Sequence, residues 1–164
     1  VDMREFRSTL PSMLHKRGMQ VVPLTISMGD YILTPSLWVE RKSLADLVQS
    51  FSSGRLYTQI QNLSRHTRNP VLLIEFKENQ PFSLVPRGEI MGEISVHSII
   101  SKLCLLTIHF PRLRILWAQT PYATASIFET LKKDNPQPDE AKFIRDGKAD
   151  DNLADDSEVV AETE

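Results

Sequence analysis

The sequence predicts an α/β fold, with a mixed central sheet flanked by helices, and three features predict it. Residues 70–76 are apolar except for Glu75, as expected for a central strand that is covered on both faces. Two shorter strand-like runs enclose a turn at residues 34–36, which predicts a hairpin. Segments with apolar residues at helical spacing alternate with these runs, so helices should cover the sheet.

The N-terminal part of the chain is predicted to contain a strand, a helix and a second strand. The first strand ends within residues 1–5. A helix follows over residues 8–17, because its apolar residues lie on one face and Gly18 provides a C-terminal stop. Residues 19–26 carry four aliphatic side chains and are predicted to form a strand.

The next segment combines the hairpin with two helices. Residues 30–33 and 37–42 are the predicted hairpin strands. A helix begins after Ser43, which forms a capping box with Asp46 in place of the usual glutamate. A second helix is predicted over residues 55–66.

The remaining elements are predicted as a loop at residues 77–93, a helix at 95–109, a strand at 113–117 and a helix at 121–133. The helix at 95–109 is apolar nearly all round, whereas packing against one layer needs only an apolar stripe. This excess indicates burial on a second side, either by the domain itself or by a partner subunit.

The charge distribution divides the 164-residue chain in two. Residues 1–133 contain 16 basic and 10 acidic residues, whereas residues 134–164 contain 3 basic and 11 acidic residues. We therefore predict one domain over 1–133 and an acidic linker or tail over 134–164 that is expected to be disordered. A basic body suits a polyanion such as nucleic acid. No apolar run approaches the roughly 18 residues of a membrane span, so no membrane partner is predicted.

The candidate site centres on charges at the end of the hairpin. Strand alternation puts Glu40 and Lys42 on one side and Arg41 on the other. A hairpin closed on residues 34–36 places Asp30 opposite Glu40, with β carbons about 4.5–5.5 Å apart. Two such carboxylates can share Mg²⁺, and Lys42 would then stand beside the metal. Alternatively, Asp30 is a turn aspartate and the other charges form a solvated strand end.

Two further acids accompany this cluster. Asp2 stands at a strand end with Arg4 on the same face two residues on, but spacing does not say whether that strand neighbours the hairpin. Asp46 lies in the first turn of the following helix, where it either caps the helix or holds Lys42 or Arg41 in place.

These residues resemble the nuclease signature of the XPF family of structure-specific DNA endonucleases. The string runs from Gly29-Asp30 to Glu40-Arg41-Lys42-x-x-x-Asp46. The similarity covers about residues 1–140, including the stretches at 1–6, 54–57, 70–75 and 109–114. It implies a variant of the restriction-endonuclease fold. The family also carries a helicase-like region before this domain and a tandem helix-hairpin-helix region after it, so we expect a piece of a longer protein.

The resemblance implies that Mg²⁺ or Mn²⁺ supports nicking of one DNA strand near a double-strand/single-strand junction. It implies nucleotide excision repair and interstrand crosslink repair in the nucleus, with a nuclease-like partner subunit in a heterodimer or with self-association. The implied catalytic residues are Asp2, Arg4, Asp30, Glu40, Arg41, Lys42 and Asp46. Of these, Asp2, Asp30 and Glu40 are the expected metal ligands.

Two alternatives remain at this level. Arg55, Arg65 and Arg68 follow the motif on a helix and are candidates for DNA phosphate contacts, or they form a solvated helix face. The chain is an active nuclease, or it is an inactive nuclease-like scaffold that binds DNA or a partner. An inactive relative should have lost several of the acids and the lysine, and all of them are present.

Overall fold

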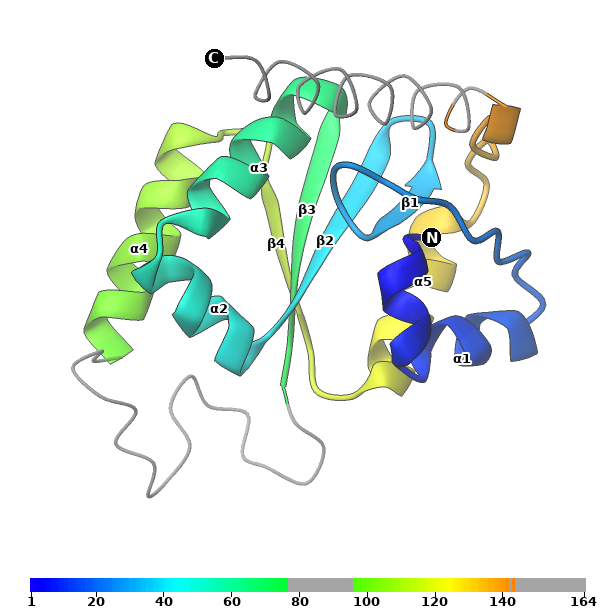
Figure 1. Cartoon of the computed structure of the whole chain (residues 1–164), viewed down its shortest axis with the longest axis horizontal. Coiled ribbons are helices and arrows are strands. Elements are labelled where there is room, and N and C mark those ends of the chain that lie inside the picture. The colour runs from blue at the N-terminus through cyan, green and yellow to red at the C-terminus, as the bar shows by residue number, and fades with distance from the viewer. Residues whose placement is uncertain (77–95, 142, 144–164) are drawn as a thin grey trace, which may run out of the picture.

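The computed structural model describes residues 1–76, 96–141 and 143, and its centre is one four-stranded sheet (Figure 1). The strands are β1 (Tyr31–Thr34), β2 (Leu37–Ser43), β3 (Asn69–Glu75) and β4 (Arg114–Ala118), in that spatial order. β1 runs antiparallel to β2, while β2, β3 and β4 run parallel to one another. The predicted mixed α/β fold is therefore confirmed, as is the hairpin.

Helices cover both faces of the sheet (Figure 1). α2 (Leu44–Ser52), α3 (Arg55–His66) and α4 (Val96–His109) lie on one side, and α1 (Leu10–Lys16) and α5 (Pro121–Lys132) lie on the other. Within the described residues, no helix combines the length and the apolar character that a membrane crossing demands.

β3 is the central strand because its successive side chains enter two different cores. Leu72 and Ile74 join the core beneath α2, α3 and α4, whereas Val71 and Leu73 join the core beneath α1 and α5. All four side chains are at most 2 % exposed. Double-sided burial explains why this strand is an unbroken apolar run rather than an alternating one.

The same alternation fixes the orientation of β2. Trp38 packs into the core beneath α2, α3 and α4, and Val39 packs into the opposite core. Continuing the alternation, Glu40 and Lys42 fall on the α3 side of the sheet and Arg41 on the α5 side. Tyr31 of β1 pairs with Val39, so Asp30, just before β1, is brought beside Glu40.

The two strands predicted before the hairpin are wrong. Residues 3–7 form a short 3-10 helix, η1 (Met3–Arg7), because the Asp2 side chain caps it through the Arg4 N–H. The predicted strand at 19–26 is reduced to a single bridge between Leu24 and Asp2. Pro23 has no N–H to donate, which interrupts any ladder in this run.

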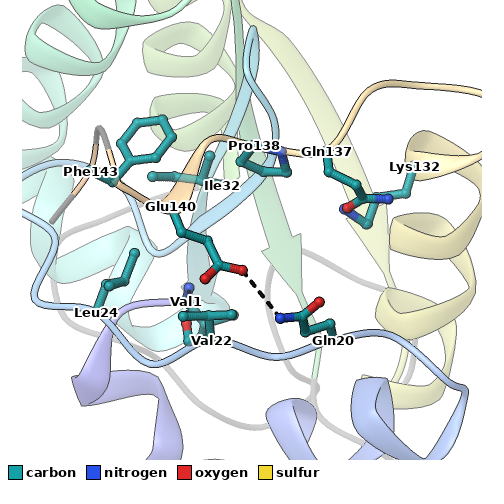
Figure 2. A pocket seen from close by; sticks show the side chains of 10 residues that line it. All are labelled: Val1, Gln20, Val22, Leu24, Ile32, Lys132, Gln137, Pro138, Glu140 and Phe143. Carbon is teal, nitrogen blue, oxygen red and sulfur yellow. Dashed lines mark hydrogen bonds between the residues drawn. The ribbon is translucent and has the colours of Figure 1, made fainter.

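The described part of the predicted tail packs against the domain. Glu140 accepts a hydrogen bond from Gln20 at 3.2 Å, in a small hollow of about 100 Å³ (Figure 2). The Phe143 ring contacts Trp38 edge-on, with ring centroids 5.4 Å apart. The predicted loop at 77–93 and most of the predicted tail lie outside the described residues, so the domain boundary at residue 133 stays a prediction.

Candidate active site

A polar hollow of about 350 Å³ opens where β2 leads into α2. Its walls come from η1, the turn before β1, the end of β2, the first turn of α2 and one face of α3. The lining includes most of the residues predicted for the site, namely Arg4, Asp30, Glu40, Arg41, Lys42, Asp46 and Arg55. The fold thus collects charges that are up to 51 positions apart in sequence.

Glu40 and Lys42 form a buried ion pair on the predicted face of β2. Their side chains are 5 % and 9 % exposed, and Lys42 Nζ lies 2.7 Å from Glu40 Oε1. The same oxygen accepts a hydrogen bond, at 2.8 Å, from Gln59 Nε2 on α3. Buried charges require such partners, so the two side chains are held in defined positions.

Asp30 is positioned by the turn that precedes β1. Gly29 adopts φ +74°, and a Cβ at this position would stand 3.1 Å from Leu63 Cδ1. The Asp30 carboxylate accepts the Arg41 N–H at 2.7 Å. Burial, followed by the nearby charge of Glu40, raises the pKa of Asp30 to about 7. The Asp30 and Glu40 carboxylates therefore repel each other strongly when no cation lies between them.

This donor set fits a hydrated divalent cation. Within residues 1–76, 96–141 and 143, no three acidic, histidine or cysteine side chains gather into a complete set of protein ligands. Mg²⁺ commonly uses one or two carboxylates and keeps several waters. Asp30 and Glu40 meet that requirement, and a cation would relieve the repulsion that raises the Asp30 pKa.

Asp2 does not line the hollow. Its carboxylate accepts four hydrogen bonds, from the Arg4 N–H, from Arg4 Nε and Nη2, and from the Ile26 N–H, at 2.7–3.1 Å. Burial alone would raise the pKa of Asp2, but the bonds from Arg4 and Ile26 hold it below its usual range. The geometry makes Asp2 the anchor of Arg4, which does line the hollow. Its assignment as a metal ligand stays a prediction.

Arg41 contributes to the lining, but its guanidinium is engaged by two acids. It contacts Glu75 Oε1 at 2.5 Å and Glu5 Oε2 at 3.0 Å. Glu75 also accepts a 2.6 Å hydrogen bond from Thr124 of α5, and Glu5 accepts one of 2.7 Å from Tyr31. Arg41 therefore ties η1, β3 and, through Glu75, α5 to the strand that carries Glu40.

Asp46 lies in the capped first turn of α2 and also lines the hollow. Ser43 Oγ accepts the Asp46 N–H at 3.1 Å and donates to Asp46 Oδ2 at 2.6 Å. Asp46 thus takes part in the N-terminal cap of α2 through Ser43, and among the described residues its carboxylate forms no hydrogen bond or ion pair with Lys42 or Arg41. Its catalytic role stays a prediction.

The three arginines predicted to contact DNA do not lie together. Arg55 lines the hollow and donates to Ser50 Oγ at 3.1 Å. Arg65 lies in the last turn of α3, Arg68 lies just after it, and neither lines the hollow. Their contact with DNA stays a prediction.

Among the residues in and around the hollow that the sequence analysis missed are Gln59, Glu75 and Glu5. Gln59 lies one helical turn after Arg55 and so shares its face, which is a signal that could have indicated it. Glu75 ends a strand that is buried from Pro70 onward, where an acid needs a partner. For Glu5, whose partners Tyr31 and Arg41 are distant in sequence, no local signal exists.

Comparison with known proteins places the chain in one family. The ERCC4 domain matches residues 1–131. The chain is 60 % identical over 141 residues to the DNA repair endonuclease XPF of Cricetulus griseus, and 54 % identical over 147 residues to the DNA repair endonuclease UVH1 of Arabidopsis thaliana. These alignments cover 86 % and 90 % of the chain but 15 % of each relative.

A solved structure, XPF from Aeropyrum pernix in complex with DNA, superimposes with a TM-score of 0.69 at 32 % identity. The match covers 81 % of this chain and 62 % of that one. The likeness confirms the expected restriction-endonuclease-like fold class.

Proposed function

The chain belongs to the ERCC4 domain family, in its XPF branch, and from this premise we propose that it is the nuclease domain of a structure-specific DNA repair endonuclease. The observation that carries the proposal is the hollow in which Asp30, Glu40 and Lys42 meet. Burying charged side chains in a hollow costs folding free energy, and such a cluster of charges is typical of a catalytic site.

The proposed reaction is hydrolysis of one phosphodiester bond. Water adds to phosphorus, one P–O bond to the sugar breaks, and a phosphate monoester and a hydroxyl result. Asp30 and Glu40 would hold Mg²⁺ or Mn²⁺, which supplies an activated water and neutralises developing charge when bound. The Lys42 ammonium, held by Glu40, adds fixed positive charge where charge builds up on phosphate.

The proposed substrate is DNA with a junction between double-stranded and single-stranded regions. The basic body of the chain, the DNA-bound XPF from Aeropyrum pernix and the relatives named DNA repair endonuclease support this class. Arg4 and Arg55 line the hollow, and their contact with phosphates of the substrate is part of the proposal. Roles in excision and crosslink repair, and a nuclear location, belong to the same proposal.

We also propose that a nuclease-like partner subunit, or a second copy of this chain, covers the exposed side of α4. Ile100, Leu105 and Ile108 on this helix are 44 %, 53 % and 71 % exposed, so no described residue covers this side. An exposed apolar strip of this kind is typical of an interface. We expect Ile108→Asp to weaken association measured by sedimentation. Thr130→Asp, at an exposed position on α5 across the sheet, should leave association unchanged. Equal association of Ile108→Asp and the unchanged protein would contradict this assignment.

The site is tested by nicking of a splayed-arm duplex with Mn²⁺ in the full-length protein. Lys42→Ala should reduce the rate at least a hundredfold, since it removes the cation nearest Glu40. Lys133→Ala, at an exposed position after α5, should cut at the normal rate. Undiminished cutting by a folded Lys42→Ala variant would refute the site assignment.

A further inference from the structure

The two carboxylate oxygens of Glu40 have different surroundings. Oε1 lies 2.7 Å from Lys42 Nζ in an ion pair and accepts a hydrogen bond from Gln59 Nε2 at 2.8 Å. Oε2 receives none from the part of the chain that the structure describes. The Lys42 ammonium and the Gln59 amide both lie against Oε1, so Oε2 is the oxygen that Glu40 can offer to a ligand.

The Gln59 amide has a defined orientation and an orphaned oxygen. If the amide were reversed, its oxygen would face the Glu40 carboxylate and two acceptors would meet. With Nε2 on Glu40, the amide Oε1 is buried and finds no hydrogen-bond donor among the described residues. Buried polar atoms are rarely left in this state, so the oxygen requires an explanation.

A helix-packing role does not explain Gln59. The buried stripe of α3 is formed by Leu56, Ile60 and Leu63, whereas Gln59 is half-buried and lines the polar hollow. An apolar side chain of the same length would fill the space without an unsatisfied oxygen. The amide is therefore better explained by what it does toward the hollow than by what it contributes to the core.

We propose that Gln59 is a positioning residue for the divalent cation, an inference that rests on the proposed nuclease function. Its Nε2 fixes Glu40 so that Oε2 remains free, and its Oε1 accepts a hydrogen bond from a water of the hydrated cation. Mg²⁺ and its substitutes keep several waters, which supply the donor that Oε1 lacks. Groups that orient metal ligands in this way contribute about 10- to 100-fold to metal affinity or activity.

The decisive variant is Gln59→Met, which preserves side-chain length and removes both hydrogen-bonding ends of the amide. Mn²⁺ affinity is measured by calorimetry on the DNA-free 164-residue chain, and thermal unfolding is measured in EDTA. We expect affinity to fall about 10- to 100-fold, and the Mn²⁺ concentration for half-maximal nicking to rise by a similar factor. The unfolding midpoint should be unchanged or higher, because the variant removes an orphaned buried oxygen.

Gln61→Met is the matched control, since Gln61 is half-buried on the same helix but does not line the hollow. It should leave Mn²⁺ affinity unchanged. Two results would overturn the assignment of Gln59: normal Mn²⁺ affinity in Gln59→Met, or a loss of Mn²⁺ affinity that only accompanies a lowered unfolding midpoint. In either case, the proposed function stands if the wild type cuts DNA. A wild-type chain that neither binds Mn²⁺ nor, at full length, cuts DNA would overturn both.

Discussion

Neutralising Asp30 should stabilise the cation-free protein while it abolishes nicking. Asp30→Asn keeps an oxygen that can accept the Arg41 N–H, but it removes the charge that burial and Glu40 disfavour. The pKa of Asp30 rises from 3.8 to about 7 on folding. At about 1.4 kcal/mol per pKa unit, ionised Asp30 lowers the free energy of unfolding by about 4 kcal/mol at high pH.

The sign of this pH dependence follows from which state, unfolded or folded, releases the Asp30 proton at lower pH. Below pH 3.8 the carboxyl is protonated in both states, so it imposes no penalty. Between pH 3.8 and about 7 the unfolded chain releases the proton first, so this contribution to stability is lost as the pH rises and is fully lost above pH 7. The stability difference between Asp30→Asn and the wild type should therefore be small at pH 4 and greatest at pH 8–9.

Urea unfolding in EDTA at several pH values between 4 and 9 measures this difference. Asp134→Asn, at an exposed position with φ +59°, is the control, and its difference in stability from the wild type should be the same at every pH. Mn²⁺ at pH 8 should then stabilise the wild type more than Asp30→Asn and narrow the gap. An Asp30→Asn variant that is no more stable than the wild type at pH 9, or a gap that does not depend on pH, would refute the reasoning.

Two further predictions concern the frame of the site. Arg41→Met leaves the partner carboxylates without their cation, so we expect the free energy of unfolding to fall by about 3–5 kcal/mol in urea unfolding. Adding Glu75→Gln should restore part of this loss, and no recovery would argue against the network. Gly29→Ala combines a left-handed φ of +74° with a close contact, and should cost more than the roughly 1–2 kcal/mol of φ strain. Gly18→Ala has a φ of +82° and open space around it, so an equal cost in the two variants would contradict the role of crowding.

The fold was largely predictable because its strands carry strong local signals. The run at 70–76 has to be buried on both faces, and the turn at residues 34–36 has to reverse the chain. The prediction for the early segments is wrong because apolar content at 19–26 indicates strand pairing, whereas a single bridge holds Leu24 to Asp2. The hydrogen bond from the Arg4 N–H to the Asp2 side chain, which caps η1, competes with strand formation. Such a side-chain cap leaves no trace in the apolar periodicity of the sequence.

From the sequence, the site was predictable only for residues whose positions follow from strand alternation and hairpin register. Alternation places Glu40 and Lys42 on one side of β2, and the hairpin register adds Asp30. Contacts that cross between elements, such as Gln59 to Glu40 and Glu75 to Arg41, depend on how α3 and β3 pack against β2. Sequence spacing contains no information on that packing, so these contacts emerged only from the structure.

The position of a bound cation tests the central claim most directly. Crystals of the chain soaked in Mn²⁺ should show anomalous difference density between the Asp30 and Glu40 carboxylates, and Asp30→Asn crystals treated in the same way should show much weaker density there. Density that appears elsewhere in the wild type, with none between these two carboxylates at saturating Mn²⁺, would contradict the account.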